Sequence, residues 1–512
     1  MNFLDLLYGT ECLAQQGNPH IAGLDYDSRR VQPGWCFVAM RGGTTDGNGY
    51  IDAALQAGAV AVVSDSLSPR GEIPWARVQH GRRALAHLSA NFYCRPAEKL
   101  AITGITGTNG KTTTSFLLNA MLRAGERKSA LIGTIEYRIE EQHYPAPHTT
   151  PEPLELNQFF ARALTARCTE AVMEVSSHAL EQQRVYGIPF DVAVFTNLTR
   201  DHLDYHPTME DYFASKAILF QGSGTVPPRV AVINVEDEYG KRLIKLCSKQ
   251  TLVVTYGSDS GDFHAKNVEI EPAGTKFDLV TPTGEHAIWT PLLGRVNVYN
   301  IIAASAAAMA RNIEARALID AIHHLDRVPG RFERVDAGQP FTVIVDYAHT
   351  DDALRNLTTV ARDFLAQRGA AGRIITVFGC GGDRDRSKRP LMGQAAGKGS
   401  DFVVLTSDNP RSENPLDIMN DVLPGLQRSG TRYTLEPDRR KAIVLAIGEA
   451  GPGDMVLIAG KGHEKVQVTQ SGTAPFDDIE EARKALHAAG YGTESNTKPA
   501  SDSALEARPA KP

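Results

Sequence analysis

Short apolar runs alternate with amphipathic stretches along most of the chain. In the first hundred residues, apolar runs at 36–40, 59–63 and 76–78 alternate with helical patterns at 52–57 and 81–92. Short apolar runs bounded by turn residues are typical of buried strands, and apolar positions three or four residues apart are typical of helices. The pattern therefore predicts a small α/β domain over residues 1–97.

The same alternation continues in a second unit, predicted over residues 98–329. It begins with a strand at 100–103 and a helix through 115–122, which should end at Gly125, because glycine commonly follows a helix end. Further buried strands are expected at 171–175, 192–195, 230–233 and 252–255.

The pattern restarts after residues 329–330, which predicts a third domain over 330–492. Its apolar runs lie at 341–345, 373–378, 402–405 and 455–458. Strands that alternate with helices indicate parallel βαβ units and a doubly wound, Rossmann-like sheet. Each of these runs leads directly into a polar or glycine-rich segment. Ligands of open α/β sheets bind at the carboxyl ends of the strands, so we expect the chemistry at that edge.

Composition narrows the class of protein. The 512 residues carry a net charge of −6 and are 42% hydrophobic, which is ordinary for a globular protein and argues against nucleic-acid binding. The six cysteines are scattered without a CxxC pair, which excludes common zinc and thioredoxin motifs and suits a reducing compartment. No signal-peptide pattern or long apolar run is present, so we expect a cytoplasmic protein without membrane insertion. The tail at 493–512 has a composition typical of disorder.

A glycine-rich loop, Gly-Ile-Thr-Gly-Thr-Asn-Gly-Lys-Thr-Thr at 104–113, lies between a predicted strand and a predicted helix. Glycines allow backbone N–H groups to approach phosphate, and the helix N-terminus adds partial positive charge. Lys111 would reach the β and γ phosphates, and the Thr112 hydroxyl would bind Mg²⁺. The spacing departs from the general GxxxxGK[ST] form, because Ile105 stands where the first glycine is expected. The competing interpretation is a glycine turn that caps a core helix.

Five motifs together resemble those of the Mur ligases. They are GTNGKTT at 107–113, PGRFE at 329–333, DYAH at 346–349, DNPR at 408–411 and GKGHE at 460–464. With the first domain, the resemblance runs from about Tyr26 to Glu464, nearly the whole chain. The DNPR motif is similar to that of the members that add meso-diaminopimelate. The resemblance implies an α/β fold of three domains: a UDP-substrate-binding domain, a central P-loop ATPase domain with a parallel-rich sheet, and a C-terminal Rossmann-like domain for the amino acid.

The resemblance also implies the reaction. In this family ATP phosphorylates a substrate carboxylate, and an amine attacks the acyl phosphate to give an amide, ADP and phosphate. The expected substrates are ATP, UDP-MurNAc-L-Ala-D-Glu and meso-diaminopimelate, with Mg²⁺ as cofactor, in cytoplasmic peptidoglycan precursor synthesis. A monomer is expected.

The family's functional residues transfer to matching positions of this chain. The catalytic set is Lys111, Glu174 and Lys216, the last carbamylated by CO₂ in the family. The metal set is Thr112, Glu174 and His202. The ATP set is Gly107, Thr108, Asn109, Gly110, Lys111, Thr112, Thr113, Asn297 and Arg331, with Asp346 closing on ATP. The UDP-MurNAc-dipeptide set is Tyr26, Ser28, Gly43, Thr44, Thr45, His148, Thr149, Thr150, Ser176, Gln182 and Arg184. The diaminopimelate set is Arg384, Asp408, Asn409, Pro410, Arg411, Gly460 and Glu464.

Three positions depart from the family pattern. Tyr26 stands where leucine is common, His148 where many members have asparagine, and Val296 where histidine is frequent. Arg411 matches the members that add diaminopimelate, not those that add lysine. Its guanidinium can pair with the second carboxylate of diaminopimelate, a group that lysine lacks.

Other interpretations of these residues stay open. Taken singly, Glu174 could be a strand-end surface charge, His202 a polar residue at a helix start, and Lys216 an exposed lysine. A folylpolyglutamate synthase-like ligase would share the ATP loop but would need neither the first domain nor the DNPR motif. A non-catalytic P-loop regulator would also bind nucleotide, although Lys111, Thr112, Glu174 and Lys216 together argue against it.

Overall fold

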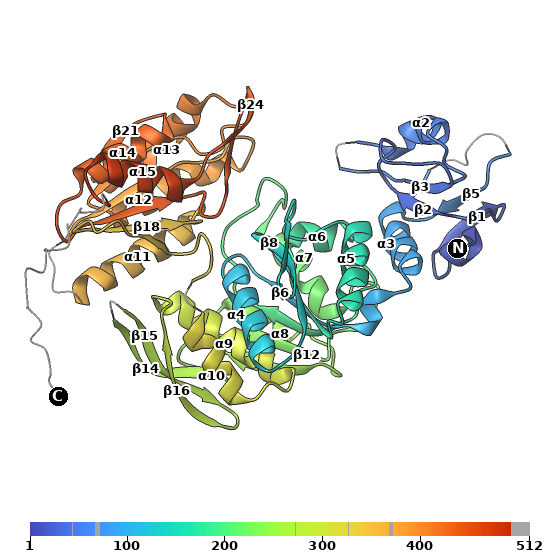
Figure 1. The fold of residues 1–512 in the computed structure, drawn as a ribbon, viewed down its shortest axis with the longest axis horizontal. Helices are drawn as coiled ribbons and strands as arrows, with labels where there is room; N and C mark the ends of the chain where they lie inside the picture. Colours follow the sequence, from blue (N-terminus) through green and yellow to red (C-terminus); the bar gives the residue numbers. More distant parts are fainter. Residues whose placement is uncertain (44, 67–71, 272, 326, 368–371, 493–512) are drawn as a thin grey trace, which may run out of the picture.

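The computed structural model describes residues 1–43, 45–66, 72–271, 273–325, 327–367 and 372–492. Thr44 of the predicted UDP site and the predicted disordered tail at 493–512 lie outside these residues. Three lobes follow one another along the chain, with the central lobe between the N-terminal and C-terminal lobes (Figure 1). Each lobe contains its own main sheet, so the α/β architecture expected from the alternating pattern is confirmed.

The N-terminal sheet has the strand order β1-β5-β4-β3-β2, parallel except for β1. Its strands are β1 (Cys12–Gln16), β2 (Gly23–Asp25), β3 (Trp35–Ala39), β4 (Ala61–Ser64) and β5 (Trp75–Val78), and its helices are α1 (Phe3–Leu6), η1 (Gly47–Tyr50), α2 (Ile51–Gln56) and α3 (Gly81–Phe92). The strands and helices predicted from apolar patterning are confirmed. The pattern missed β1 because four of its five residues are exposed, so it carries no apolar run.

The central sheet has the order β13-β12-β11-β6-β10-β7-β8-β9, parallel as far as β7, followed by an antiparallel hairpin. Its strands are β6 (Ala101–Thr106), β7 (Ser129–Ile132), β8 (Glu136–Ile139), β9 (Gln142–Pro145), β10 (Glu170–Glu174), β11 (Phe190–Phe195), β12 (Val230–Asn234) and β13 (Leu252–Tyr256). β6 lies in the middle because both its faces are apolar: Ile102 packs into one core and Ile105 into the other.

Helices cover both faces of the central sheet. They are η2 (Pro96–Lys99), α4 (Lys111–Ala124), α5 (Pro153–Thr165), α6 (Ser177–Glu181), α7 (Met209–Gln221), α8 (Glu238–Ile244), α9 (Arg295–Ala310) and α10 (Ala315–His324). A separate antiparallel sheet of β14 (His264–Glu271), β15 (Gly274–Thr281) and β16 (Gly284–Thr290) was not predicted, because its strands alternate buried and exposed residues and contain no continuous apolar run.

The C-terminal sheet has the order β17-β18-β22-β19-β20-β21 and is parallel except for β17. Its strands are β17 (Glu333–Val335), β18 (Thr342–Asp346), β19 (Ile374–Phe378), β20 (Phe402–Leu405), β21 (Arg432–Leu435) and β22 (Met455–Ala459), with a hairpin of β23 (Val466–Thr469) and β24 (Gly472–Pro475). Its helices are α11 (Asp351–Gln367), η3 (Arg386–Lys388), α12 (Arg389–Gly399), α13 (Pro415–Ser429), α14 (Arg439–Glu449) and α15 (Asp478–Ala488). All four predicted strands are confirmed. In the described part of the chain, no helix is long and apolar enough to span a membrane.

Candidate active site

The loop between β6 and α4 has the backbone geometry that its glycines allow. Gly107 (φ +150°) and Gly110 (φ +86°) both have positive φ, a region that L side chains rarely adopt. A Cβ atom at Gly107 would lie 1.9 Å from Thr196 Oγ1, and one at Gly110 would lie 2.4 Å from Asn300 Oδ1. Glycine is therefore required at both positions, and the loop leads directly into the N-terminus of α4.

Lys111 is the first residue of α4 and its side chain folds back over the loop. Its Nζ donates to the carbonyl oxygens of Gly107, at 3.0 Å, and Thr108, at 2.9 Å. Burial lowers the pKa of Lys111. The amine thus lies over the backbone that would face phosphate.

Glu174 ends β10 and is fully buried beside Thr112. Its Oε2 accepts hydrogen bonds from Thr112 Oγ1, at 3.0 Å, and Thr134 Oγ1, at 2.9 Å, while its Oε1 accepts from the Thr134 backbone N–H at 2.9 Å. Arg331, from the C-terminal side of the molecule, donates through Nη2 to Thr112 Oγ1 at 3.2 Å. The structure therefore brings Thr112, Glu174 and Arg331 together. Thr134 was missed, because it stands in no recognisable motif.

Lys216 lies on α7 and only 2% of it is exposed, so its interpretation as an ordinary exposed lysine is wrong. Its Nζ donates to Gly107 O at 2.8 Å and lies 4.6 Å from the ring centroid of Tyr212. Burial, together with nearby Lys111, lowers the pKa of Lys216 well below its ordinary value. Burial therefore favours the neutral form of this amine, which lies beside the phosphate loop.

His202 follows Asp201 in the loop between β11 and α7. It has a φ of +55°, its backbone N–H donates to Asp201 Oδ1 at 2.9 Å, and its ring packs edge-on against His178 at 4.9 Å between centroids. The structure records no hydrogen bond from His202 to Thr112 or Glu174. Among the described residues, no three His, Cys, Asp or Glu side chains form a metal-binding group.

The residues predicted to hold the dipeptide arm form one network next to Glu174. Thr150 Oγ1 donates to Glu174 O at 2.9 Å and accepts from the Ser176 N–H at 3.1 Å, and Arg184 Nη1 donates to Thr150 O at 2.9 Å. Thr149 Oγ1 lies 3.1 Å from Thr134 Oγ1.

Gln182 and His148 flank this network. Gln182 Oε1 accepts from Arg184 Nη2 at 2.8 Å, while Gln182 Nε2 donates to Tyr205 at 3.2 Å. His148 has an exposed side chain, and its carbonyl accepts a hydrogen bond from Tyr137.

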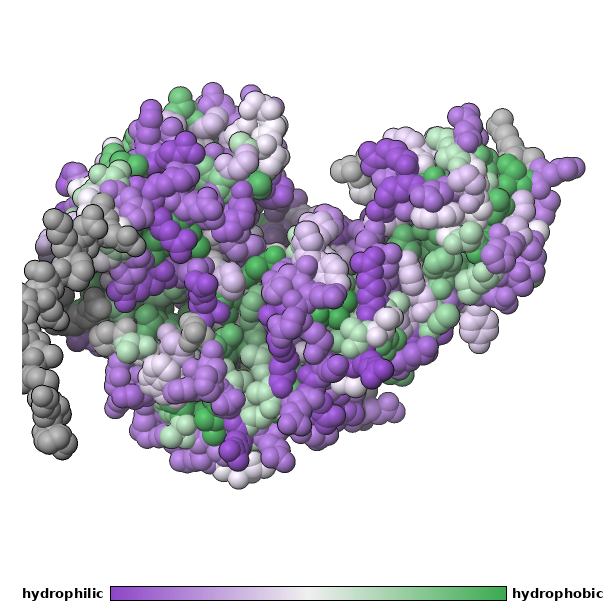
Figure 2. All heavy atoms as spheres, viewed as in Figure 1, coloured by the Kyte–Doolittle hydropathy of each residue, from purple (hydrophilic) through white to green (hydrophobic). Residues whose placement is uncertain are grey.

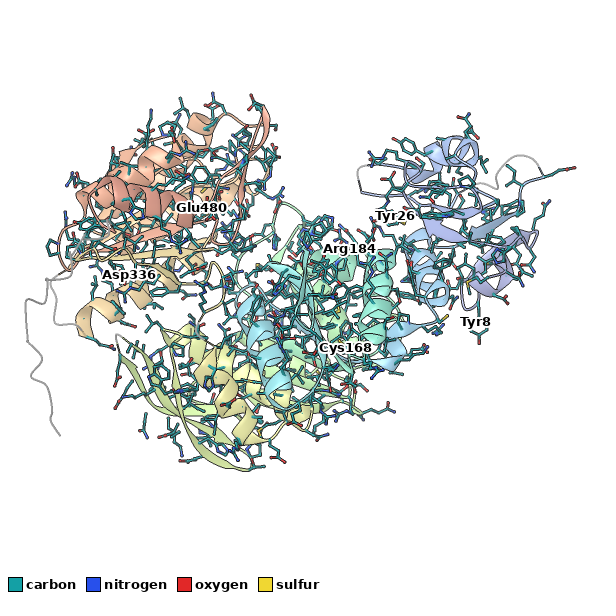
Figure 3. All side chains as sticks on the ribbon, viewed as in Figure 1. Tyr8, Tyr26, Cys168, Arg184, Asp336 and Glu480 are labelled. Atoms are coloured by element: carbon teal, nitrogen blue, oxygen red, sulfur yellow. The ribbon has the colours of Figure 1, made fainter. Side chains whose placement is uncertain are left out.

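The predicted residues of the N-terminal lobe are only partly brought to the central lobe. Tyr26 OH donates to Glu155 Oε1 on α5 at 3.0 Å, and Figure 3 shows Tyr26 and Arg184 bordering the same side of the molecule, where Figure 2 shows a hollow between the lobes. Ser28 lies on the turn after β2. Gly43 and Thr45 are exposed, and a Cβ atom at Gly43 would meet no atom within 4 Å.

Asn297 lies in the first turn of α9 and is linked to the phosphate loop through Asn300. Its Nδ2 donates to Leu293 O at 2.8 Å, and its Oδ1 accepts from Asn300 Nδ2 at 3.2 Å. Asn300 Oδ1 in turn accepts from Thr114 Oγ1 at 3.4 Å, next to Gly110. Asn300 is a second polar residue at this edge that the motifs did not single out.

The predicted amino-acid residues converge at the carboxyl ends of β19, β20 and β22. Asn409 Nδ2 donates to Glu464 Oε2 at 2.9 Å, and a Cβ atom at Gly460 (φ +118°) would lie 3.2 Å from Asp408 Oδ2. Arg411 Nη1 donates to Gly382 O at 2.7 Å. Burial, with the nearby Arg384 charge, lowers the pKa of Arg411.

Two buried cations beneath this cluster were not predicted. Lys461 is fully buried, and its Nζ donates to Asn409 Oδ1 at 2.8 Å and lies 3.3 Å from Asp408 and 3.5 Å from Glu464. Arg439 pairs with Asp478 at 2.7 Å, both side chains being fully buried, and donates to Ala459 O at 2.9 Å. Arg439 thus fixes the end of β22, from which the Gly460–Glu464 segment begins.

A glycine loop between β6 and α4, together with a second mostly parallel sheet whose carboxyl edge carries charged residues, is typical of α/β proteins that bind phosphorylated ligands. Three family models match the chain: the Mur ligase family catalytic domain over residues 20–93, the Mur ligase middle domain over 105–308 and the Mur ligase glutamate ligase domain over 330–462. The chain belongs to the Mur ligase family.

Individual relatives show which Mur ligases the chain resembles. A UDP-N-acetylmuramoyl-L-alanyl-D-glutamate–2,6-diaminopimelate ligase of Solibacter usitatus is 52% identical over 473 residues, which cover 92% of this chain and 94% of that protein. A solved structure of a ligase with the same name has a TM-score of 0.67 at 35% identity and covers 96% of this chain and 99% of its own. The folylpolyglutamate synthase of Mycobacterium tuberculosis has a TM-score of 0.61 at 21% identity over 74% of this chain and 93% of its own, a likeness of fold alone.

Proposed function

We propose that this enzyme uses ATP to join meso-diaminopimelate to UDP-MurNAc-L-Ala-D-Glu through an acyl phosphate, in the synthesis of peptidoglycan precursors. The observation that carries the proposal is the hydrogen bond from Arg331 to Thr112, because it joins the C-terminal lobe to the phosphate loop. This contact supports the proposal that the amino-acid cluster and the ATP loop serve one site. The high identity to ligases of that name over nearly the whole chain supports the choice of substrates.

Lys111 and Arg331 would supply the positive charge for phosphoryl transfer. Both contact the loop or the first turn of α4, where the β and γ phosphates would lie. Preorganised cations lower the barrier because they need not reorganise as charge develops. Lys111 would exchange its two carbonyl partners for phosphate oxygens when ATP binds.

The oxygen donors of Thr112 and Glu174 fit Mg²⁺, which prefers one or two hard protein ligands and completes its shell with water and phosphate oxygens. Bound there, Mg²⁺ would neutralise phosphate charge. His202, on the facing loop, is proposed as a third residue at this centre. The Thr134 hydroxyl and amide hold the Glu174 carboxylate in place.

Lys216 is proposed to carry a carbamate. The modification requires a neutral amine and CO₂, and burial next to Lys111 favours that neutral form. The carbamate would replace the buried amine with an anionic oxygen ligand directed at the ATP centre. Tyr212, whose ring lies under Lys216, would confine its movement.

The Thr149–Ser176–Arg184 network is proposed to hold the dipeptide arm with its carboxylate near the phosphate loop. The hydroxyls are hydrogen-bond donors and Arg184 provides a planar fork for an anionic oxygen. Asp408, Glu464 and Arg411 would hold the two ammonium and two carboxylate groups of diaminopimelate, with its nucleophilic amine directed at the acyl phosphate.

The test is ADP release by the full chain with UDP-MurNAc-dipeptide and meso-diaminopimelate, compared with folate and glutamate, and with no acceptor. Release that needs both peptidoglycan precursors supports the proposal. Release with folate and glutamate would favour the folylpolyglutamate-type alternative. Nucleotide binding with no turnover in all three conditions would favour a regulator.

A further inference from the structure

Two loops from different lobes face each other with alternating charges. One is the segment 200–204 of the central lobe, between β11 and α7, and the other is the segment 383–388 of the C-terminal lobe, between β19 and α12. Arg200 Nη1 donates to Ser387 Oγ at 3.1 Å and lies 3.5 Å from Asp385 Oδ2. In the next position, Asp201 Oδ1 lies 3.7 Å from Lys388 Nζ.

The order of charges specifies one register between the loops. A cation followed by an anion on the central loop meets an anion and then a cation on the C-terminal segment. A shift that brought Arg200 opposite Arg384 or Arg386 would place like charges together, which costs several kcal/mol when the charges are poorly solvated. The side chains of Asp201 and Lys388 are only 7% and 12% exposed, so salt screens their attraction weakly.

A third contact extends the junction to the loop after β18. His349 Nε2 lies 3.9 Å from Asp201 Oδ2, and the carbonyl of His349 accepts a hydrogen bond from Lys388 Nζ at 3.2 Å. Asp201 therefore contacts two C-terminal loops that are themselves joined to each other. Such a buried anion holds both loops in a single orientation.

An open depression of about 580 Å³ lies beside these two segments. Asp204 forms its central-lobe wall, and the C-terminal lobe contributes the rest: Asp383, Arg384, Arg386, Glu413, Asn414 and Asp417. Arg384 immediately precedes Asp385, and His202 immediately follows Asp201. The paired loops thus connect the amino-acid side of the site with the ATP side.

We propose that Arg200 and Asp201 are positioning residues that dock the 383–388 segment against the central lobe and thereby set the affinity for the amino-acid acceptor. The inference rests on the proposed function. It assigns to two residues outside the predicted site the task of completing the acceptor pocket from the central lobe.

A double-mutant cycle tests this pairing. The variants are Arg200→Gln, Asp385→Asn and the two combined, because asparagine can still accept the Ser387 N–H that Asp385 now accepts. Each single variant should raise KM for meso-diaminopimelate roughly tenfold with little change in KM for ATP, as expected for a lost charge pair. KM of the double variant should equal that of the single variant with the higher KM, since the interaction is already gone. Single variants within twofold of wild type, or effects that multiply, would overturn the proposal.

Arg242→Gln is the matched control, because Arg242 also forms an ion pair with a carboxylate, Glu210, but within the central lobe. It should leave KM for ATP, for the UDP substrate and for meso-diaminopimelate unchanged. All variants should keep the wild-type melting temperature.

Small-angle X-ray scattering of the full chain tests the docking without relying on activity. The double variant Arg200→Gln/Asp201→Asn should lengthen the maximum dimension relative to wild type and Arg242→Gln should not, whereas superimposable curves for all three proteins would overturn the proposal; asparagine can still accept the His202 N–H that Asp201 now accepts. If the wild type released no ADP with the peptidoglycan precursors, the proposed function would fail while scattering still decided the docking.

Discussion

Arg411 offers the sharpest test of the acceptor assignment. The residue lies in the left-handed backbone region, with φ +52°, and its N–H donates to Val468 O at 3.0 Å. Non-glycine residues adopt this conformation rarely and at a cost of about 1–3 kcal/mol. Its Nη1 donates to Gly382 O at 2.7 Å, which leaves the other guanidinium donors for a ligand carboxylate.

The expected loss follows from the burial of this guanidinium. Arg411 is half-buried next to Arg384, and this burial lowers the pKa of its guanidinium. Removing one member of a buried charge pair costs about 2–5 kcal/mol, and each 1.4 kcal/mol is about tenfold. Arg411→Ala should therefore raise KM for meso-diaminopimelate by about thirtyfold or more. KM of Arg411→Lys for meso-diaminopimelate should lie between the values of the wild type and Arg411→Ala, because lysine keeps the charge and loses the bidentate fork.

The assay is the ratio of kcat/KM for meso-diaminopimelate to that for lysine, measured in the wild type and in Arg411→Ala. The ratio should collapse, because lysine lacks the carboxylate that Arg411 would pair with. KM for ATP and for the UDP substrate should hold. Arg362→Ala is the control, since Arg362 pairs with Asp401 at 2.7 Å elsewhere on the C-terminal lobe. An unchanged ratio in Arg411→Ala would refute the acceptor assignment even if ligation survived.

Four further outcomes are expected. Lys111→Ala should lower kcat for ADP release by about 10²–10³, as for other lost transition-state cations, with an unchanged melting curve. Lys216→Ala should be nearly inactive and partly rescued by a short added carboxylate, and full activity without rescue would argue against the carbamate. Because burial and Asp408 raise the pKa of Glu464, this group should lose its charge at a higher pH than an ordinary glutamate on acidification; KM for diaminopimelate should then rise, and Glu464→Gln should flatten that pH profile. Arg439→Met should cost about 3–5 kcal/mol of unfolding free energy in urea titrations, because it leaves Asp478 buried and unpaired.

The strands could be predicted from the sequence where their complete burial produces a run of apolar residues. β12, β20 and β22 are buried along their whole length, and most or all of their residues form a continuous apolar run. β14 has only two buried residues among its eight and β1 is mostly exposed, so neither has that signal. Apolar patterning therefore located most of the inner strands and the edge strand β13, and it missed the other edge strands and the antiparallel sheet.

The candidate site divides in the same way. The glycines of the phosphate loop were predictable because a left-handed turn between strand and helix requires them at Gly107 and Gly110. Thr134 and Asn300 were not, because an isolated threonine or asparagine carries no local pattern, and each reaches the site only through strand pairing or helix packing. The roles carried over from the family, including those of His202 and Asn297, stay predictions until variants are assayed.

Lys461 shows how the net charge of a buried cluster can influence which amino acid is bound. In the sequence it is one lysine in a glycine-rich segment, yet the fold buries it completely between Asp408 and Glu464. A buried cation is tolerated only with partners, and these two carboxylates provide them. With both carboxylates ionised, two negative charges and one positive charge leave a net charge of −1. One substrate ammonium group would neutralise the cluster, whereas a second carboxylate would be repelled there and would be directed to Arg411.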